Sequence, residues 1–368
     1  MLESRRPDAA RRRMRLRSVL REAWRNASTG TARCGTLALV LMVLVLTTLG
    51  AEISTVAAAE RQATEFRAAG ASILTISAPG RVDAARCESL RDLPGVHTAG
   101  ALTVRPDESV AAVALTGAPM PAADASPGFP AVVGATTDGG PGLILTDDAA
   151  ATLGLGLGDR LSATTGSSRL AGTYTYPRDG RRDGYGYLAV SVTGYRAPFD
   201  ECWVEAWPMT TDLNPLLFTV LRPGGGVDDV PQVQQLNSTL GSGLDGFGLF
   251  HERATRFGGL LVGLVAVVVA FVAVRARRVE LATALHDGMR RRDLWTIVLL
   301  ESALWAAPAV AVGTAFSLTW FGRDGDLLVG TVLGARVVLS VLAGSATGVA
   351  VALATTHEKD LFAYAKDR

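Results

Sequence analysis

Lysine is almost absent from this sequence. Only Lys359 and Lys366 occur in 368 residues, and neither follows a glycine loop of the Walker type. The 4 histidines are scattered, no His-Glu-x-x-His motif is present, and the 3 cysteines form no Cys-x-x-Cys pair. We therefore expect no catalytic residue, no metal site and no bound cofactor in this chain.

One glycine motif has the spacing of a dinucleotide-binding loop. In "GSGLDG", the residues Gly241, Gly243 and Gly246 match Gly-x-Gly-x-x-Gly. The motif follows a helix-like segment rather than a strand, so it lacks the structural context that phosphate binding requires. We interpret it as a turn close to a membrane.

Long apolar runs are what the sequence does have. Hydrophobic residues make up 48% of the chain, and the mean hydropathy is +0.26. Four runs approach the length of roughly 20 residues that crosses the hydrocarbon layer of a bilayer. The predicted spans are residues 34–58, 257–274, 294–320 and 337–355, with an external loop over 321–336.

The placement of arginine predicts the orientation of these spans. Residues 1–33, which we expect to form a basic cytoplasmic helix, carry ten Arg against three acidic residues, and the loop over 275–293 carries six Arg. Short basic flanks stay in the cytoplasm, so both termini, including the tail over 356–368, are predicted to be cytoplasmic. Residues 59–256 then form an extracytoplasmic domain with 15 Arg and no Lys against 22 Asp and Glu.

The sequence allows alternatives for the fate of the first apolar run and for the position of Arg336. The first apolar run is followed by Ala57, Ala58 and Ala59, a composition that signal peptidase also accepts, although the long basic leader favours a retained span. An arginine at mid-bilayer costs at least about 2.5 kcal/mol. We therefore place Arg336 at the outer interface, just before the fourth span.

Alternation of apolar and polar residues predicts strands in the external segment. Residues 71–79 and 96–104 are predicted strands on either side of a helix, within a βα unit over about 71–130. "PLLFTVLRPGGG" and "DDVPQVQQLNSTLGSGL" predict a strand and then a helix, a second βα unit over about 215–245. The insert over about 131–214 is strand-rich, with a predicted hairpin whose tyrosines pack on a sheet surface.

Two of the cysteines lie in this external domain, where thiols can oxidise. A disulfide between Cys87 and Cys202 would link the first βα unit to the strand-rich insert, but the sequence does not decide whether this bond forms.

Together with the apolar runs, the features of the external domain predict the fold class. It is an α-helical membrane protein with four transmembrane helices and an α+β extracytoplasmic domain between helices 1 and 2.

Small residues recur in the spans at a spacing that lets helices approach closely. Gly259 and Gly263 form a Gly-x-x-x-Gly pair in the second span, and Gly344 and Gly348 form another in the fourth. This spacing serves packing within one chain or a subunit interface equally well. Glu301, near the start of the third span, is expected either to pair helices or to contact the cytoplasmic loop.

Residues 275–293 are charged and helix-patterned although they lie between two predicted spans. The apolar residues Leu281, Ala284 and Leu285 fall on one helical face, and Gly288 interrupts the helix before the next span. This pattern predicts a short interfacial helix, a turn and re-entry into the membrane.

Two segments carry a family resemblance. "VELATALHDGMRRRDLWTIVLLESAL" resembles the cytoplasmic segment and third span of the FtsX-like and MacB-like permeases of ABC transporters. "GLILTDDAAATLGLGLGDRLSA" resembles a strand, an Ala-rich helix and a Leu-Gly-Leu-x-x-Gly-Asp turn of that family's external domain. In "LHDG" the chain departs from the family's apolar or basic run, which leaves open which ATPase would fit. The matching residues are Glu280, Gly288, Arg291, Arg292, Leu294, Glu301, Leu153, Gly154, Leu155, Gly158 and Asp159.

The resemblance implies a mechanism called mechanotransmission. Two permease chains assemble with two separate cytoplasmic ATPases, which bind ATP and magnesium, and closure of the ATPases moves the external domains. By family position, the residues expected to couple to the ATPase are Arg277, Arg278, Glu280, Leu281, Ala284, Gly288, Arg291 and Arg292. The N-terminal segment "LRSVLREAWRNA" is expected beside them.

The function that the resemblance implies is that of a permease subunit in a bacterial plasma membrane, for export or extrusion of lipids, peptides or antibiotics. One alternative is an FtsX-like signalling subunit that regulates a cell-wall hydrolase outside the membrane. Another is a membrane-anchored enzyme or receptor that has no ATPase. The expected partners are the ATPase, a second permease chain of the same or a different kind, membrane lipids and an extracytoplasmic protein, but no nucleic acid.

Overall fold

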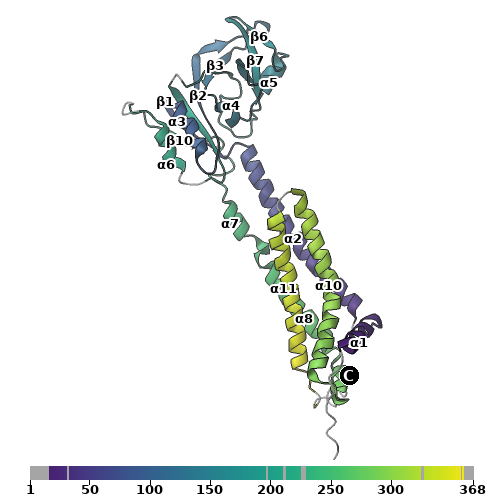
Figure 1. Ribbon diagram of the computed structural model, residues 1–368. Coiled ribbons are helices and arrows are strands. Elements are labelled where there is room, and N and C mark those ends of the chain that lie inside the picture. The colour runs from purple at the N-terminus through teal and green to yellow at the C-terminus, as the bar shows by residue number, and fades with distance from the viewer. Residues whose placement is uncertain are drawn as a thin grey trace, which may run out of the picture. The chain divides into compact units, whose positions relative to one another are not determined.

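The computed structural model describes residues 16–359 except 31–32, 196–197, 210–212, 225–228, 325–326 and 358 (Figure 1). The chain divides into two compact units. The helical unit comprises Met1–Ala58 and His251–Arg368, and the α/β unit comprises Ala59–Phe250. Most of the predicted cytoplasmic tail and the first half of the basic N-terminal segment lie outside the described residues.

Four helices among the described residues are long and apolar enough to cross a membrane. They occur where the sequence predicts spans, although α10 is longer than predicted on both sides. The N-terminal segment forms an additional helix, and the stretch between the second and third spans forms a short one. The helices are α1 (Leu16–Ser28), α2 (Cys34–Ala68), α8 (Gly258–Arg275), α9 (Arg278–His286), α10 (Arg291–Asp324) and α11 (Leu327–Ala354), with the turn η4 (Ala254–Phe257) before α8.

The helical unit has one main hydrophobic core, to which all four long helices contribute. Large aliphatic side chains from the first part of α2 and small residues of α8 both belong to this core, so it is filled by complementary sizes rather than by one residue type. The amphipathic α1 packs on α10 through Val19, Ala23 and Ile297. Representative core residues are Leu41, Val45, Val262, Ala266, Ala270, Trp305, Ala309, Val337 and Val341.

The fourth span begins earlier than predicted. Because α10 continues to Asp324 and α11 starts at Leu327, most of the segment 321–336 is helical where a loop was predicted. Arg336 lies inside α11, where its guanidinium donates to the backbone oxygen of Arg256. Arg256 lies just before α8, so Arg336 meets its partner near the predicted start of the second span. A carbonyl partner of this kind lowers the cost of an arginine in or near a span.

The α/β unit is built on one mixed ten-stranded sheet with the order β10-β1-β9-β2-β3-β8-β5-β7-β4, and β6 pairs with β7. Short helices and turns connect the strands. The strands are β1 (Ile73–Val82), β2 (Val96–Val110), β3 (Met120–Ala125), β4 (Thr136–Thr137), β5 (Leu143–Thr146), β6 (Arg160–Ala163), β7 (Gly166–Tyr174), β8 (Ala189–Val192), β9 (Phe199–Ala206) and β10 (Gln232–Gln235). The helices are α3 (Ala84–Ser89), α4 (Phe129–Val132), α5 (Asp147–Thr152), α6 (Leu213–Leu217) and α7 (Gly246–His251), with turns η1 (Leu90–Asp92), η2 (Val113–Leu115) and η3 (Phe218–Val220).

The first predicted βα unit is confirmed, with one addition. β1, α3 and β2 follow each other as expected, and Asp83 caps α3 by accepting hydrogen bonds from the amides of Ala85 and Arg86. β9 lies between β1 and β2 and is antiparallel to both. The two strands of the unit are thus joined through a strand that comes about a hundred residues later in the chain, a separation that periodicity does not reveal.

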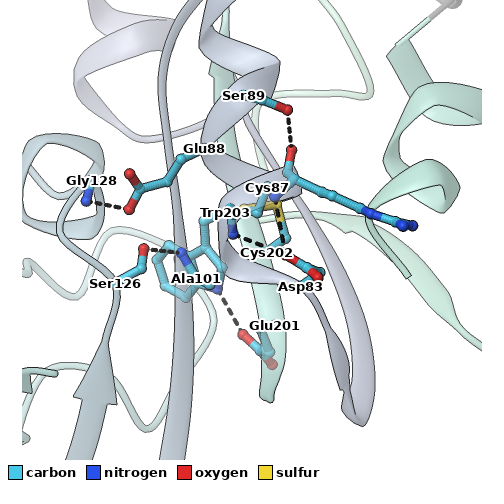
Figure 2. The surroundings of a disulfide bond; sticks show 12 residues. Asp83, Cys87, Glu88, Ser89, Ala101, Ser126, Gly128, Glu201, Cys202 and Trp203 are labelled. Carbon is cyan, nitrogen blue, oxygen red and sulfur yellow. Dashed lines mark hydrogen bonds between the residues drawn. A yellow bond between two sulfur atoms is a disulfide. The ribbon is translucent and has the colours of Figure 1, made fainter. Parts of the chain in front are cut away.

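A disulfide joins α3 to β9. The sulfur atoms of Cys87 and Cys202 are 2.01 Å apart (Figure 2), and both residues are fully buried. Beside the bond, the carboxylate of Glu88 accepts a hydrogen bond of 2.5 Å from the amide of Gly128 (Figure 2). The bond that the sequence left open is present, and it fixes the helix of the βα unit to the strand at the centre of that unit.

The second predicted βα unit is wrong, because its two elements occur in the reverse order. "PLLFTVLRPGGG" forms α6 and η3, whose buried residues Leu213, Leu217 and Val220 are spaced four and three apart, as on one face of a helix. The segment predicted as a helix after Pro231 forms β10, which pairs with β1. The proline precedes an edge strand here and not a first helical turn.

The predicted hairpin is also wrong. β7 and β8 do not pair with each other, because β5 lies between them, parallel to β7 and antiparallel to β8. All four residues of β5 are buried. A strand that is apolar on both faces takes an inner position in the sheet, and this separates the two strands that a simple hairpin would join.

Three tyrosines of the insert, Tyr174, Tyr176 and Tyr185, pack into a core of the α/β unit, whereas Tyr187 and Tyr195 are exposed. The ring of Tyr185 lies edge-on to Trp203, with centroids 4.9 Å apart, and its hydroxyl donates to Glu201 at 2.9 Å. Arg182 donates to the same carboxylate at 2.8 Å. Burial raises the pKa of Tyr185 above its ordinary value, so the hydroxyl keeps the proton that it donates.

Candidate coupling site at the junction of α8 and α9

The second span is followed almost at once by the predicted interfacial helix. α8 ends at Arg275 and α9 starts at Arg278, so only Ala276 and Arg277 separate them. α9 ends at His286, and Gly288 then takes a positive φ of 92°, which favours glycine. The short helix and the turn that the sequence predicts are therefore present, and α10 follows them.

One face of α9 is buried in the helical unit and the other is exposed. Leu281, Ala282 and Leu285 are buried, and Leu281 and Leu285 belong to the main core. Leu281 is only 4% exposed, and Ala284 packs against the same core. Leu281 therefore packs α9 against the core, whereas Ala284 is half-buried and keeps part of its side chain at the surface.

Arg277 connects the junction to two other elements. It donates to Glu301 of α10 at 2.6 Å and to both carboxylate oxygens of Glu280 at 2.7 and 3.0 Å. The other oxygen of Glu301 accepts from Asn26 of α1 at 2.7 Å. Through this one cluster, the end of α8, the first turn of α9, α10 and α1 are held together.

The buried carboxylate of Glu301 depends on its partners in this cluster. Glu301 is only 2% exposed, and a buried carboxylate is tolerated only when charged or hydrogen-bonding partners compensate it. Burial alone lowers the pKa of Arg277, but hydrogen bonds and charges of Glu280 and Glu301 outweigh it and hold the pKa above its ordinary value. Arg277 therefore stays charged and keeps Glu301 compensated.

The other predicted coupling residues surround this cluster. Glu280, with 45% of its side chain exposed, lies on the outer face of α9 in its first turn. Arg291 and Arg292 are exposed at the start of α10, and Arg278 begins α9. The exposed surface of the site thus consists of the outer face of α9, the end of α8 and the start of α10. Thr283 lies at the centre of this surface.

Sequence reasoning missed Asn26 and a second buried ion pair. Val19, Ala23 and Asn26 are spaced four and three apart, so the helical period that identifies the buried face of α1 would have included Asn26. The second pair joins Arg253 and Glu52 at 3.2 Å within the helical unit. Its signal in the sequence was a single acidic residue inside the first apolar run.

All four glycines of the predicted packing motifs lie where α8 meets α11. A Cβ atom on Gly344 would lie 2.2 Å from the backbone oxygen of Gly263. A Cβ on Gly348 would lie 2.2 Å from the backbone oxygen of Val267, and one on Gly259 would lie 3.0 Å from Arg336. The structure thus uses these glycines for packing within one chain.

The variant Gly344→Ala tests this contact. Because the added methyl group meets backbone and not a flexible side chain, we expect a loss of about 1–3 kcal/mol of stability. The matched change Gly50→Ala in α2 meets nothing within 4 Å, and we expect no loss there. Thermal unfolding of both purified variants measures the difference, and equal unfolding temperatures would contradict the packing.

Comparison with known proteins gives the following result. No family model and no curated protein matches the chain. The periplasmic region of MacB from Actinobacillus actinomycetemcomitans is similar in structure, with 9% identity, a TM-score of 0.34 and coverage of 46% of this chain and 91% of that chain. A domain of a "putative Permease protein" from Porphyromonas gingivalis has 11% identity, a TM-score of 0.31 and coverage of 46% and 92%.

The first of these proteins is named as MacB and the second as a permease. At these scores the likeness carries no argument about what this chain does. The function is therefore argued from the chain's own residues.

Proposed function

We propose that this protein is the transmembrane permease subunit of an ABC transporter. It couples ATP hydrolysis by a separate cytoplasmic ATPase to movement of the α/β unit, and its cargo is a lipid, a peptide or an antibiotic that leaves the bacterial plasma membrane. The observation that carries the proposal is the short turn from α8 into α9, which Arg277 fixes to α10 and α1. The resemblance of the same segment to the family's cytoplasmic segment supports it.

The geometry gives the coupling a physical basis. α9 is buried along one face and hydrogen-bonded at its first turn, so a force on its exposed face reaches α8 without first bending the junction. A transition of this kind is a rigid-body movement of packed helices. Arg277 has a positioning role, because it acts through Glu280 and Glu301 and not on ATP.

We also propose a membrane topology and a set of partners for the chain. Both termini and α9 face the cytoplasm, where the ATPase with its ATP and magnesium binds, and the α/β unit lies outside the membrane. Arg25, Arg33, Arg275 and Arg278 flank the spans on the side of α9, as expected for cytoplasmic flanks. A second permease chain completes the assembly, and an extracytoplasmic protein is a further candidate partner.

The exposed face of α9 gives the direct test. Thr283 is exposed and donates only to the carbonyl of Val279 in its own helix, so Thr283→Trp adds bulk at the proposed contact without disturbing the Arg277 cluster. We expect the wild-type chain to co-purify with an ATPase in mild detergent and the variant to lose it, with at least tenfold lower ATP turnover in the pulled-down material, about 1.4 kcal/mol.

A matched control separates the contact from general damage. Thr152 in α5 is also exposed and also donates to a carbonyl in its own helix, so Thr152→Trp makes the same chemical change in the α/β unit. This variant should retain the ATPase. Failure of the wild-type chain to retain any ATPase, or equal retention by both variants, would contradict the proposal.

A further inference from the structure

An apolar groove lies in the helical unit between the start of α2 and the end of α8. Its volume is about 460 Å³, and its walls are formed mainly by valine, leucine and alanine side chains. A neighbouring hollow of about 440 Å³ shares Val272, Ala276 and Arg277 with it and continues over the first turn of α9. The groove residues are Arg33, Thr36, Leu37, Val40, Val268, Val269, Val272, Ala273, Ala276 and Arg277.

The middle of the groove is exposed on the outer surface of the helical unit. Val268 is 60% exposed and Val272 is 57% exposed, and both belong to a candidate membrane span. In a bilayer these side chains meet hydrocarbon and not water. The occupant of the groove must therefore carry an apolar chain.

One end of the groove is strongly basic. Arg33 lies just before α2, and Arg275, Arg277 and Arg278 lie at the junction of α8 and α9. Glu280 is the single acidic residue lining the two hollows, and Arg277 donates to both of its oxygens and to Glu301. The lining of this end therefore has an excess of positive charge next to an apolar channel. The excess charge comes from Arg33, Arg275 and Arg278.

We infer that this groove binds one anionic phospholipid of the leaflet next to α9. An acyl chain lies along Val40, Val268 and Val272, and the phosphate lies between Arg33 and the arginines of the α8–α9 junction. Basic pockets beside transmembrane helices attract anionic head groups, at about 1 kcal/mol for each nearby arginine or lysine. The inference does not depend on the proposed ATPase, because it concerns the surface of the isolated chain.

Charge argues against a second copy of this chain as the occupant. A two-fold interface brings the same surface of both copies together, and here it would bring the arginine clusters of both chains against each other. A lipid head group neutralises this charge, whereas a second copy doubles it.

The test is lipid binding to the delipidated full-length chain, measured by native mass spectrometry with dioleoyl phosphatidylglycerol and dioleoyl phosphatidylcholine. We expect the anionic lipid to bind more tightly to the wild-type chain. Arg33→Gln should weaken that binding about fivefold, and Arg33→Lys should restore it. Ala273→Phe, which fills the groove, should abolish the first binding event for both lipids.

Arg21→Gln provides the control for total charge. Arg21 is exposed on α1 and does not line the groove, so its removal should leave the affinity unchanged. Equal affinities of the wild-type chain for the two lipids would overturn the inference, as would wild-type binding by Arg33→Gln or Ala273→Phe. Loss of the bound lipid in a dimer would also overturn it and would assign the groove to a second chain.

Discussion

Arg277→Ala is expected to cost about 3–5 kcal/mol of stability and to abolish stimulation of the partner ATPase. The change leaves Glu301 buried without its cationic partner, and breaking a buried pair from one side has a cost of this size because one charge stays uncompensated. It also frees the first turn of α9, since Arg277 holds both oxygens of Glu280. Thermal unfolding and ATP turnover of the co-purified complex measure the two effects.

A double variant separates stability from coupling. Arg277→Met combined with Glu301→Leu replaces the buried pair by apolar side chains, which is often neutral or stabilising. We expect this variant to regain most of the lost stability and yet remain uncoupled, because Glu280 and Asn26 still lack the partners that tie α9 and α1 to α10. If the double variant restores full ATPase stimulation, the cluster has a purely structural role.

Removing the disulfide is expected to lower the stability of the α/β unit by about 2–5 kcal/mol. Cys87 and Cys202 are separated by 115 residues, and a bond that closes so long a loop restricts the unfolded chain strongly. For a domain of this size, the paired change to serine should lower the unfolding temperature by roughly 10 °C. Calorimetry of the full-length chain in detergent gives the value for this unit.

Cys34 supplies the control for this prediction. It is the free cysteine among the described residues and lies at the start of α2, so Cys34→Ser should leave the unfolding temperature of the α/β unit unchanged. In the wild-type chain, alkylation under non-reducing, denaturing conditions should label Cys34 alone. Labelling of Cys87 and Cys202 at the same stage would contradict the bond.

Periodicity and composition were sufficient to locate the four long helices of the helical unit and local parts of the α/β unit. Apolar runs of about 20 residues identify spans because the bilayer fixes their length, and Gly288 marks the turn after α9 because it needs a positive φ. The segment from β5 to β6 was also predictable. Its strand, Ala-rich helix and glycine turn are all encoded within 22 residues of sequence.

The remaining features could not be predicted because they depend on pairing between segments that are far apart in the sequence. β9 lies between β1 and β2, and β5 lies between β7 and β8, yet no local pattern states which strand takes an inner position. The same limit applies to the site, because Asn26 and Glu301 are 275 residues apart in sequence and meet only in the folded chain. Arg336 likewise meets the carbonyl of Arg256, a partner 80 residues away in the chain.

Photo-crosslinking from α9 tests the central claim most directly. A photoreactive benzophenone side chain at position 283, and in a separate chain at position 152, is activated in intact cells, and mass spectrometry identifies the crosslinked proteins. We expect position 283 to capture an ABC ATPase and position 152 to capture none. Absence of any ATPase crosslinked to position 283, in a chain that is correctly inserted, would contradict α9 as the surface that receives the force of ATP binding.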